Sequence, residues 1–283
     1  MQASVDALRQ VVYEHYGLHG RDLPWRKTHE PYHIFVSEIM LQQTQVDRVK
    51  PKYESFIARF PTFAALAEAS VVELLAEWRG LGYNRRALAM QRAAGTVVQD
   101  YCGSLPEDKE ALMALPGIGE YTASAIRTFA FDKPDAFIET NIRAVFIHHF
   151  FPDANGVTDA ELLPLIRTAV DQERPRVWYQ ALMDYGTYLK RQANPSRRSA
   201  HHRPQSRFEG SRRQARGEIL RMLLENGPLS PQSLRLQVRG WDVRHDDALR
   251  GLLSEGFIGE REGHYRVGCS SDSGTDSEVL TPP

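Results

Sequence analysis

The segment from Val36 to Val46 constrains this chain most, because it places a single carboxylate inside an otherwise apolar helical run. The spacing of its apolar residues predicts one buried helical face, formed by Val36, Ile39, Met40 and Val46. A carboxylate beside such a face loses hydration, which raises its pKa and keeps a proton donor available near neutral pH. Glu38 is therefore a candidate catalytic acid; the competing interpretation is a residue that points to solvent or caps the helix.

Residues 109–125 contain the second informative pattern, in which Leu-Pro-Gly-Ile-Gly follows an apolar helical run and a new helix is expected near Tyr121. Gly117 and Gly119 allow a tight turn and let the backbone approach a phosphate closely, with the amides of the second helix pointing toward it. The pattern predicts a helix-hairpin-helix, a sequence-independent clamp on a DNA backbone. Pro-Gly-x-Gly also occurs in ordinary helix–helix connections, so the turn alone does not decide the function.

Together these segments resemble the helix-hairpin-helix (HhH-GPD) superfamily of base-excision DNA glycosylases, and most closely the MutY-type adenine DNA glycosylases. The resemblance runs from about Arg21 to Gly186, well over half the chain. Besides the hairpin, it is carried by Leu23-Pro24-Trp25-Arg26, Ser37-Glu38-Ile39-Met40-Leu41-Gln42-Gln43-Thr44, Gly80-Leu81-Gly82-Tyr83-Asn84-Arg85-Arg86-Ala87, Glu139-Thr140-Asn141-Ile142-Arg143 and Ala181-Leu182-Met183-Asp184-Tyr185-Gly186. It implies a mainly α protein with a two-lobed helical glycosylase core.

The resemblance also implies the catalytic residues. Glu38 would protonate the base and then help to activate water, and Asn141 would help to hold the water and the carboxylates. Glu139 stands where these enzymes usually carry an aspartate that stabilises the cationic sugar, and its extra methylene moves the carboxylate by about 1.5 Å. The alternative for Glu139 is a helix-capping role before Asn141. Tyr121 stands where lyases such as endonuclease III carry a lysine, so no Schiff base and no β-lyase step are expected.

Further matches imply the contacts with DNA. Gln42 and Gln43 are expected to wedge into the duplex when the target base flips out, although glutamines are also common on helix surfaces. The residues expected to contact the backbone are Gly117, Gly119 and Arg143, and those expected to line the base pocket or contact the damaged strand are Trp25, Arg26, Tyr83 and Gln180. Trp25 and Tyr83 are equally compatible with a place in the core.

The composition is that of a soluble globular protein, with 42% hydrophobic and 25% charged residues among 283. No apolar run approaches the length of a membrane span, and the N-terminus lacks a signal-peptide pattern, so we expect no membrane association. Two cysteines, Cys102 and Cys269, are too few for a disulfide framework and suit a reducing compartment, the cytoplasm with its nucleoid.

The net charge of −1 hides a basic block at residues 190–216, which holds nine Lys and Arg residues against the single acid Glu209. Such a block is typical of a phosphate-binding surface, and Arg197 and Arg198 are its candidate DNA contacts. The competing interpretation is a solvated linker, which the prolines and serines of residues 191–210 also favour.

Most relatives follow the Ala-Leu-Met-Asp-x-Gly motif with four cysteines that bind an iron–sulfur cluster. Residues 189–195 carry no cysteine here, and two thiols cannot supply four ligands, so no cofactor is expected. His201 and His202 are adjacent and project apart, so they predict no metal site either. The basic block is a candidate replacement for the positioning role of the cluster.

The domain organisation follows from these patterns. We expect a helical glycosylase core at 1–190, a basic linker at 191–210, a winged-helix-like α+β domain at 211–268 and a disordered Ser/Asp/Pro-rich tail at 269–283. The winged helix is predicted from three helical stretches followed by two short strands with a turn at Glu262-Gly263. Either packing and protein interaction or added duplex contact would suit this domain.

Three functions remain open. The first is a cluster-free, monofunctional glycosylase, expected to act as a monomer on double-stranded DNA and to release a mispaired adenine. The second keeps the chemistry but releases mismatched thymine, uracil or another lesion, because Glu139 departs from the family pattern and the usual 8-oxoguanine inspection domain is missing. The third is a non-catalytic DNA-binding or regulatory protein, against which the combination of Glu38, Tyr121, Glu139 and Asn141 argues.

Overall fold

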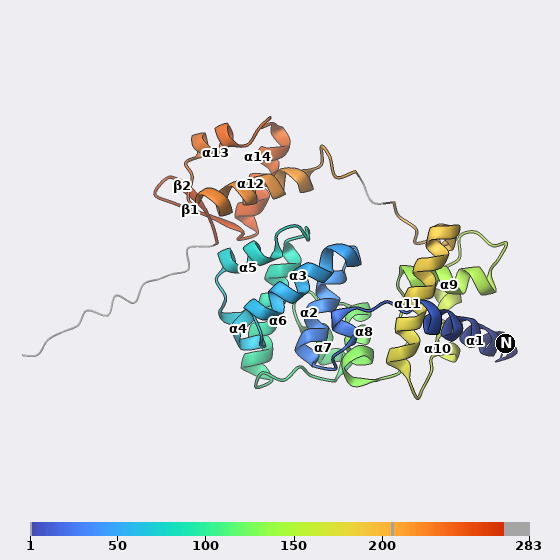
Figure 1. Ribbon diagram of the computed structural model, residues 1–283. Coiled ribbons are helices and arrows are strands. Elements are labelled where there is room, and N and C mark those ends of the chain that lie inside the picture. Colours follow the sequence, from blue (N-terminus) through green and yellow to red (C-terminus); the bar gives the residue numbers. More distant parts are fainter. Residues whose placement is uncertain (1, 205–206, 269–283) are drawn as a thin grey trace, which may run out of the picture. The chain divides into compact units, whose positions relative to one another are not determined.

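The computed structural model describes residues 2–204 and 207–268, which form two compact units (Figure 1). The first unit is built from residues 1–68 and 85–205, and the second from residues 69–84 and 206–283. The division differs from the expected 1–190 core, because residues 69–84 belong with the C-terminal unit. The expected tail at 269–283 lies outside the described residues.

All the named secondary-structure elements in the described part of the first unit are helices. Its elements are α1 (Gln2–His19), η1 (Pro24–Arg26), α2 (Pro31–Leu41), α3 (Val46–Arg59), α4 (Phe63–Glu68), α6 (Arg85–Asp100), α7 (Lys109–Ala114), α8 (Glu120–Phe131), α9 (Thr140–Phe150), α10 (Asp159–Ala169), α11 (Pro175–Gln192) and η2 (Pro195–Arg198). The mainly α prediction is therefore confirmed. Within the described residues, no helix is long and apolar enough to span a bilayer.

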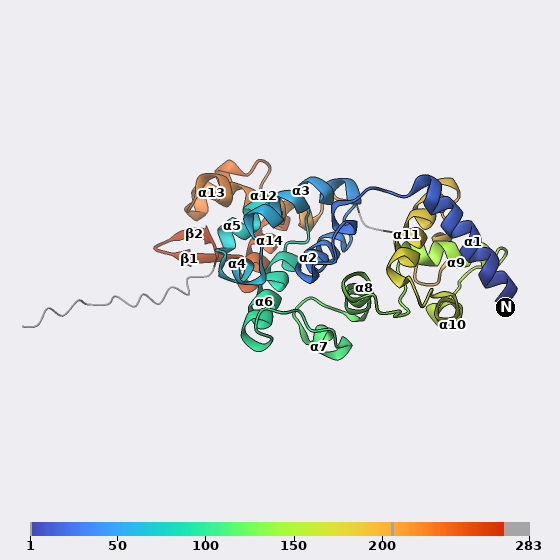
Figure 2. The ribbon, with the colours of Figure 1, turned by 60° about the horizontal axis from the view of Figure 1, so that its bottom comes forward.

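These helices pack as two groups, which match the two lobes expected for the core (Figures 1 and 2). In the first group α2 lies at the centre and packs against α3, α6 and α8. Every residue of α2 from Ile34 to Met40 is buried, so this helix has no solvent-facing stripe over that stretch. Burial on all sides explains why its sequence is apolar rather than amphipathic.

The second group joins the start of the chain to its middle. Helix α1 packs against α10 and α11, and α11 packs against α9. The Tyr13 hydroxyl donates a hydrogen bond of 2.6 Å to Asp171, and its ring lies 5.6 Å from that of Trp178. The first helix of the chain thus completes the core of a lobe whose other helices come more than a hundred residues later.

The second unit contains α5 (Val71–Trp78), α12 (Arg212–Asn226), α13 (Pro231–Gln237), α14 (Val243–Ser254), β1 (Ile258–Arg261) and β2 (His264–Val267). The strands pair antiparallel, with Ile258 opposite Val267. Glu262 and Gly263 form the turn with φ values of 54° and 72°, the geometry that a two-residue hairpin requires. Three helices followed by a β-hairpin confirm the secondary structure predicted for a winged helix.

Local differences from the sequence predictions concern element ends. Helix α2 ends at Leu41, so Gln42 and Gln43 lie in the turn before α3 rather than on a helix surface, and Val46 begins the next helix. Residues 191–210 are not uniformly irregular, because α11 continues to Gln192 and η2 follows at Pro195–Arg198.

Candidate active site

Glu38 lies in the buried centre of the first lobe, on the α2 helix that packs against α8. Its side chain is almost fully buried, with 6% of the residue exposed. Burial, reinforced by the negative charge of Glu139, raises the pKa of Glu38 to about 8. The carboxyl group therefore holds its proton at neutral pH, as the sequence led us to expect of a catalytic acid.

Glu139 begins α9 as its N-cap residue. Its Oε1 accepts hydrogen bonds from the backbone amides of Asn141 (2.6 Å) and Ile142 (2.9 Å), and its Oε2 accepts one from the Asn141 side-chain amide (3.2 Å). Burial raises the pKa of Glu139, and these donors together with the Lys190 ammonium oppose that rise. The capping alternative is thus realised, and the same carboxylate also acts electrostatically on Glu38.

The two carboxyl groups differ in their environments. Burial disfavours the anion of both carboxyl groups. A like charge adds to this effect at Glu38, whereas hydrogen-bond donors and the Lys190 ammonium oppose it at Glu139. Such a pair separates into one carboxylic acid and one carboxylate, the division of roles that acid-assisted hydrolysis needs. The helix N-terminus of α9 adds a positive partial charge on the side of Glu139.

Tyr121 lies at the start of α8, half-buried, with its ring edge-on to Phe137 at a centroid distance of 5.6 Å. Burial and then the charges of Glu38 and Glu139 raise its pKa well above the ordinary value of a phenol. Tyr121 is therefore a neutral hydrogen-bond donor beside the carboxyl pair. The structure thus gathers all four predicted catalytic residues from α2, α8 and the start of α9.

Helix α11 contributes two residues that the sequence analysis assigned no catalytic role. A side chain at Gly186 would place its Cβ only 2.4 Å from the backbone oxygen of Asn141, so glycine allows α11 to lie directly against the N-terminal turn of α9. Lys190 follows one turn later, is half-buried and lowers the pKa of Glu139. Lys190 lies four residues after Gly186 and therefore on the same face of α11. This spacing is the signal in the sequence that could have identified Lys190.

We expect Gly186→Ala to be strongly unfavourable, because its Cβ meets backbone rather than a movable side chain. Overpacking of this kind costs about 1–3 kcal/mol and would displace Asn141. The melting temperature and the single-turnover rate of base release would both fall. Gly95→Ala on α6 is the matched control, since nothing lies within 4 Å of its Cβ position and helix propensity favours alanine. Equal stability of the two variants would contradict the close approach.

Asp184 organises the segment that precedes α2. Its buried carboxylate accepts from Arg21 Nε at 2.6 Å and from both terminal nitrogens of Arg26 at 2.8 Å. Gln180 accepts from the Tyr16 hydroxyl at 3.0 Å, and Trp25 lies in the core. Because these side chains have internal partners, the base-pocket roles of Trp25, Arg26 and Gln180 stay predictions.

Tyr83, the fourth residue predicted for the base pocket, belongs to the second unit. Its hydroxyl accepts a hydrogen bond of 2.8 Å from Arg213, whose guanidinium lies 5.6 Å from the ring centroid. The cation–π contact ties the segment before α6 to the first turn of α12. A contact of Tyr83 with DNA stays a prediction.

The predicted hairpin is present between α7 and α8. Gly117 has a φ of 81° and its Cβ would lie 2.9 Å from that of Ala89, so the turn requires glycine there. Gly119 caps α8 with an ordinary φ of −97° and open space at its Cβ position. The Gln42 side-chain amide donates a hydrogen bond of 3.1 Å to the Thr122 hydroxyl. Gln43 is exposed and has a φ of 54°.

The three arginines predicted to contact DNA have different surroundings. Arg143 forms a bidentate ion pair with Asp159, with both distances 2.7 Å. Arg198 donates to backbone oxygens that follow α9, among them that of Ala154 at 3.3 Å and that of Pro152. Arg197 is exposed. Phosphate binding by all three stays a prediction, and Arg198 already serves to hold η2 against the end of α9.

Comparison with known proteins shows the family of the chain. Residues 36–167 match the family model of the HhH-GPD superfamily base excision DNA repair proteins. Over 274 residues the chain is 31% identical to the adenine DNA glycosylase of Mycolicibacterium smegmatis, an alignment that covers 90% of this chain and 94% of that protein. The chain belongs to the HhH-GPD superfamily of base excision DNA repair proteins.

Other known proteins are similar to the chain over shorter stretches. The human adenine DNA glycosylase is 36% identical over 196 residues, which cover 65% of this chain and 36% of the human protein. A thermostable thymine-DNA glycosylase structure is 28% identical with a TM-score of 0.60, covering 65% of this chain and 87% of its own. Endonuclease III in a trapped DNA complex shares the fold, with a TM-score of 0.57 at 18% identity. The match covers 66% of this chain and 87% of the endonuclease III chain.

The loop after α11 has no cysteine in its sequence, and the expectation that the protein holds no iron–sulfur cluster stays a prediction. The loop after α11 has Ser196 and Ser199 as buried residues, and the backbone around Ser199 pairs with that of Val157. Cys102, one of the two cysteines of the sequence, is exposed in the turn after α6. Hydrogen bonds from Arg198 and this backbone pairing hold the loop in place.

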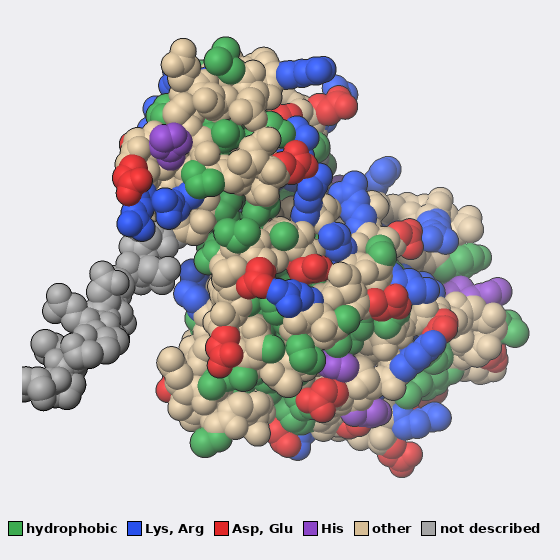
Figure 3. Space-filling view, turned by 60° about the vertical axis from the view of Figure 1, so that its left-hand side comes forward, with side chains coloured by type: hydrophobic (Ala, Val, Ile, Leu, Met, Phe, Trp, Pro, Cys, Tyr) green, Lys and Arg blue, Asp and Glu red, His purple; other side chains and the backbone are tan. Residues whose placement is uncertain are grey.

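In the winged-helix unit of this HhH-GPD protein, most arginine side chains lie close to the carboxylate of an Asp or Glu. Its ion pairs include Arg216 with Glu255 at 2.8 Å, Arg235 with Asp246 at 3.0 Å, and Arg244 with Asp242. Figure 3 shows Lys and Arg side chains interspersed with Asp and Glu over the face in view. Paired arginines attract phosphate less strongly than free ones, which favours packing or protein interaction over duplex contact for this unit.

Proposed function

We propose that the protein is a monofunctional DNA glycosylase that hydrolyses the N-glycosidic bond of a mispaired adenine flipped out of double-stranded DNA. The observation that carries the proposal is the carboxyl pair: Glu38 is protonated with a pKa of about 8, and Glu139 is a helix-capping carboxylate that acts on it electrostatically. The adenine DNA glycosylases to which the chain is similar support adenine as the base.

The chemistry follows from the two protonation states. Protonated Glu38 donates to a ring nitrogen of the base, and the bond between that base and the sugar breaks with its electron pair leaving on the base. The sugar becomes a cation, which the Glu139 carboxylate stabilises electrostatically. Water then adds to the cation, and the Glu38 carboxylate accepts its proton. In this mechanism Asn141, which donates two hydrogen bonds to Glu139, orients that carboxylate and the water.

The proposal includes the absence of a lyase step. Tyr121 stands among the catalytic groups as a neutral phenol, and a phenol cannot form a Schiff base with the sugar. We further propose that the enzyme works as a monomer and without an iron–sulfur cluster, with Arg198 and η2 holding the end of α9 in its place.

The pH dependence of base release follows from Glu38. Because its pKa is about 8, the acid is present below that pH and is lost above it. We expect the single-turnover rate to fall about tenfold per pH unit above pH 8. Binding of a duplex that already contains an abasic site is the control, since it needs no proton transfer. A rate that stays constant to pH 10 would contradict the role of Glu38 as the acid.

A second candidate is release of thymine from a mismatch. The thermostable thymine-DNA glycosylase structure that matches this chain at 28% identity favours it. Glu139 in place of the aspartate usual in adenine glycosylases also shifts the carboxylate, which is a second reason to consider a different base.

The deciding experiment is base release from a panel of duplexes. These carry adenine opposite guanine, adenine opposite 8-oxoguanine, thymine or uracil opposite guanine, and hypoxanthine, with strand cleavage scored with and without alkali. We expect alkali-dependent cleavage only at adenine. Cleavage at thymine would establish the second candidate, cleavage without alkali would overturn the monofunctional assignment, and no cleavage at all would favour a binding protein.

A further inference from the structure

Arg86 makes an unusual set of contacts with the end of the helix that carries Glu38. The last carbonyl groups of a helix have no partner within it, and they usually need a cap from outside. At the end of α2, Arg86 Nη1 approaches the backbone oxygens of Ile39 (2.8 Å), Met40 (2.9 Å) and Gln42 (2.6 Å). One guanidinium, supplied by the first turn of α6, thus caps a helix that belongs to a different part of the sequence.

The same guanidinium also holds the turn that follows α2. Arg86 Nη2 donates a hydrogen bond of 2.9 Å to the Thr44 hydroxyl. Between these two anchors stand Gln42, whose side chain reaches Thr122 on α8, and the exposed Gln43 with its left-handed backbone. Arg86 therefore fixes both ends of the segment that presents the two glutamines.

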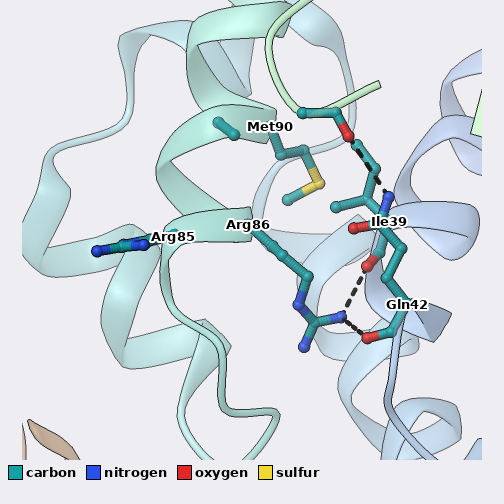
Figure 4. Close-up of a pocket in the computed structure, with 7 residues that line it drawn as sticks. Ile39, Gln42, Arg85, Arg86 and Met90 are labelled. Atoms are coloured by element: carbon teal, nitrogen blue, oxygen red, sulfur yellow. Dashed lines mark hydrogen bonds between the residues drawn. The ribbon is translucent and has the colours of Figure 1, made fainter. Parts of the chain in front are cut away.

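A cavity of about 170 Å³ lies beside this clamp, lined by Ile39, Gln42, Arg85, Ala89, Met90, Gly117 and Arg86 itself (Figure 4). In Figure 4 the Arg86 side chain extends toward the oxygens of Ile39 and Gln42, whereas Arg85 points away. The free space means that packing alone does not hold the end of α2 against α6. The Arg86 guanidinium connects them with two nitrogens, because Nη1 contacts the backbone oxygens at the end of α2 while Nη2 binds the Thr44 hydroxyl. A single ammonium cannot hold both positions in the same fixed geometry.

We propose that Arg86 is a positioning residue that sets the end of α2, and with it the Gln42–Gln43 turn and Glu38 one turn earlier, for extrusion of the target base. This inference rests on the proposed glycosylase function. A rigid turn lets the glutamines occupy the space of the departing base, and extrusion is the step that costs energy in a paired duplex. A loosened turn therefore slows release from paired targets more than from targets that are already unpaired.

The test compares Arg86→Lys with Arg92→Lys, an exposed arginine on the same helix. Arg86→Lys keeps the charge and loses the fork. We expect its single-turnover rate at adenine opposite guanine to fall about 10- to 100-fold, as for a displacement of about 1 Å. Most of that loss should disappear when adenine lies opposite an abasic site, and the melting temperature should stay close to that of Arg92→Lys.

Fluorescence of 2-aminopurine at the target position gives a second readout, which reports extrusion without base release. We expect a reduced signal for Arg86→Lys at saturating protein, and a normal one for Arg92→Lys. Wild-type rates and signal in Arg86→Lys would overturn the proposal, as would an equal loss on paired and unpaired targets. If the wild-type protein released no base, the glycosylase function would fail, while the fluorescence comparison would still decide the role of Arg86.

Discussion

Glu38→Gln is expected to lose base release by about 10³- to 10⁴-fold, the upper range of what a positioned acid contributes. The amide is nearly the same size and keeps the buried α2 packing, but it has no proton to donate at any pH. Burial makes this loss severe, because water has little access to a residue that is 6% exposed and cannot replace the acid. Single-turnover kinetics on the preferred mispair measures the effect.

The control for this variant is Glu54→Gln, which makes the same change at an exposed position on α3. Its rate should equal that of the wild-type protein. Duplex binding by Glu38→Gln should persist, because Glu38 is buried and is not among the residues expected to contact the DNA backbone. Retained base release in Glu38→Gln would remove Glu38 from the mechanism and leave Glu139 as the candidate acid.

Glu139→Gln is the second large effect, with an expected loss of about 10²- to 10³-fold in the single-turnover rate. The amide oxygen can still accept hydrogen bonds from the Asn141 and Ile142 amides, so the N-cap of α9 survives while the negative charge is lost. Removal of that charge also removes a cause of the raised pKa of Glu38. The alkaline limb of the pH–rate profile should therefore move to lower pH.

Glu139→Ala separates the two roles of the same side chain. It removes both charge and cap, and loss of an N-cap costs about 0.5–2 kcal/mol of unfolding free energy. The melting temperature should therefore fall in Glu139→Ala but stay unchanged in Glu139→Gln. Thr158→Ala, which removes only the N-cap of α10, should lower stability without slowing base release. Full activity in Glu139→Gln would reduce Glu139 to a capping residue.

Much of the site was predictable because its signals are local. The hairpin could be predicted from Pro-Gly-x-Gly, because its turn needs a left-handed φ at Gly117, which few residues other than glycine adopt. Glu38 was readable because a lone carboxylate in an apolar run must be buried or must end the run. The β-turn at Glu262-Gly263 was also predicted correctly, since it depends on residues only a few positions apart.

The contacts made by Arg86, Asp184 and Lys190 were not predictable, because each depends on partners far away in the sequence. Arg86 and Asp184 were quoted within motifs, yet nothing local shows that one caps α2 and the other binds Arg21 and Arg26. The end of α2 at Leu41 was missed for a related reason. The apolar periodicity of the sequence continues to Val46, whereas the group that caps the end of α2, the Arg86 guanidinium, comes from another helix.

The sequence by itself determined a mainly helical chain with a glycosylase motif set, a buried acid and a C-terminal winged-helix pattern. Only the tertiary structure decided that α1 completes the lobe of α9 to α11, that residues 69–84 join the C-terminal unit, and that Glu139 both caps α9 and raises the pKa of Glu38. The reason is physical: capping, turns and periodicity act over a few residues, whereas burial and electrostatic coupling depend on which distant segments the fold brings into contact.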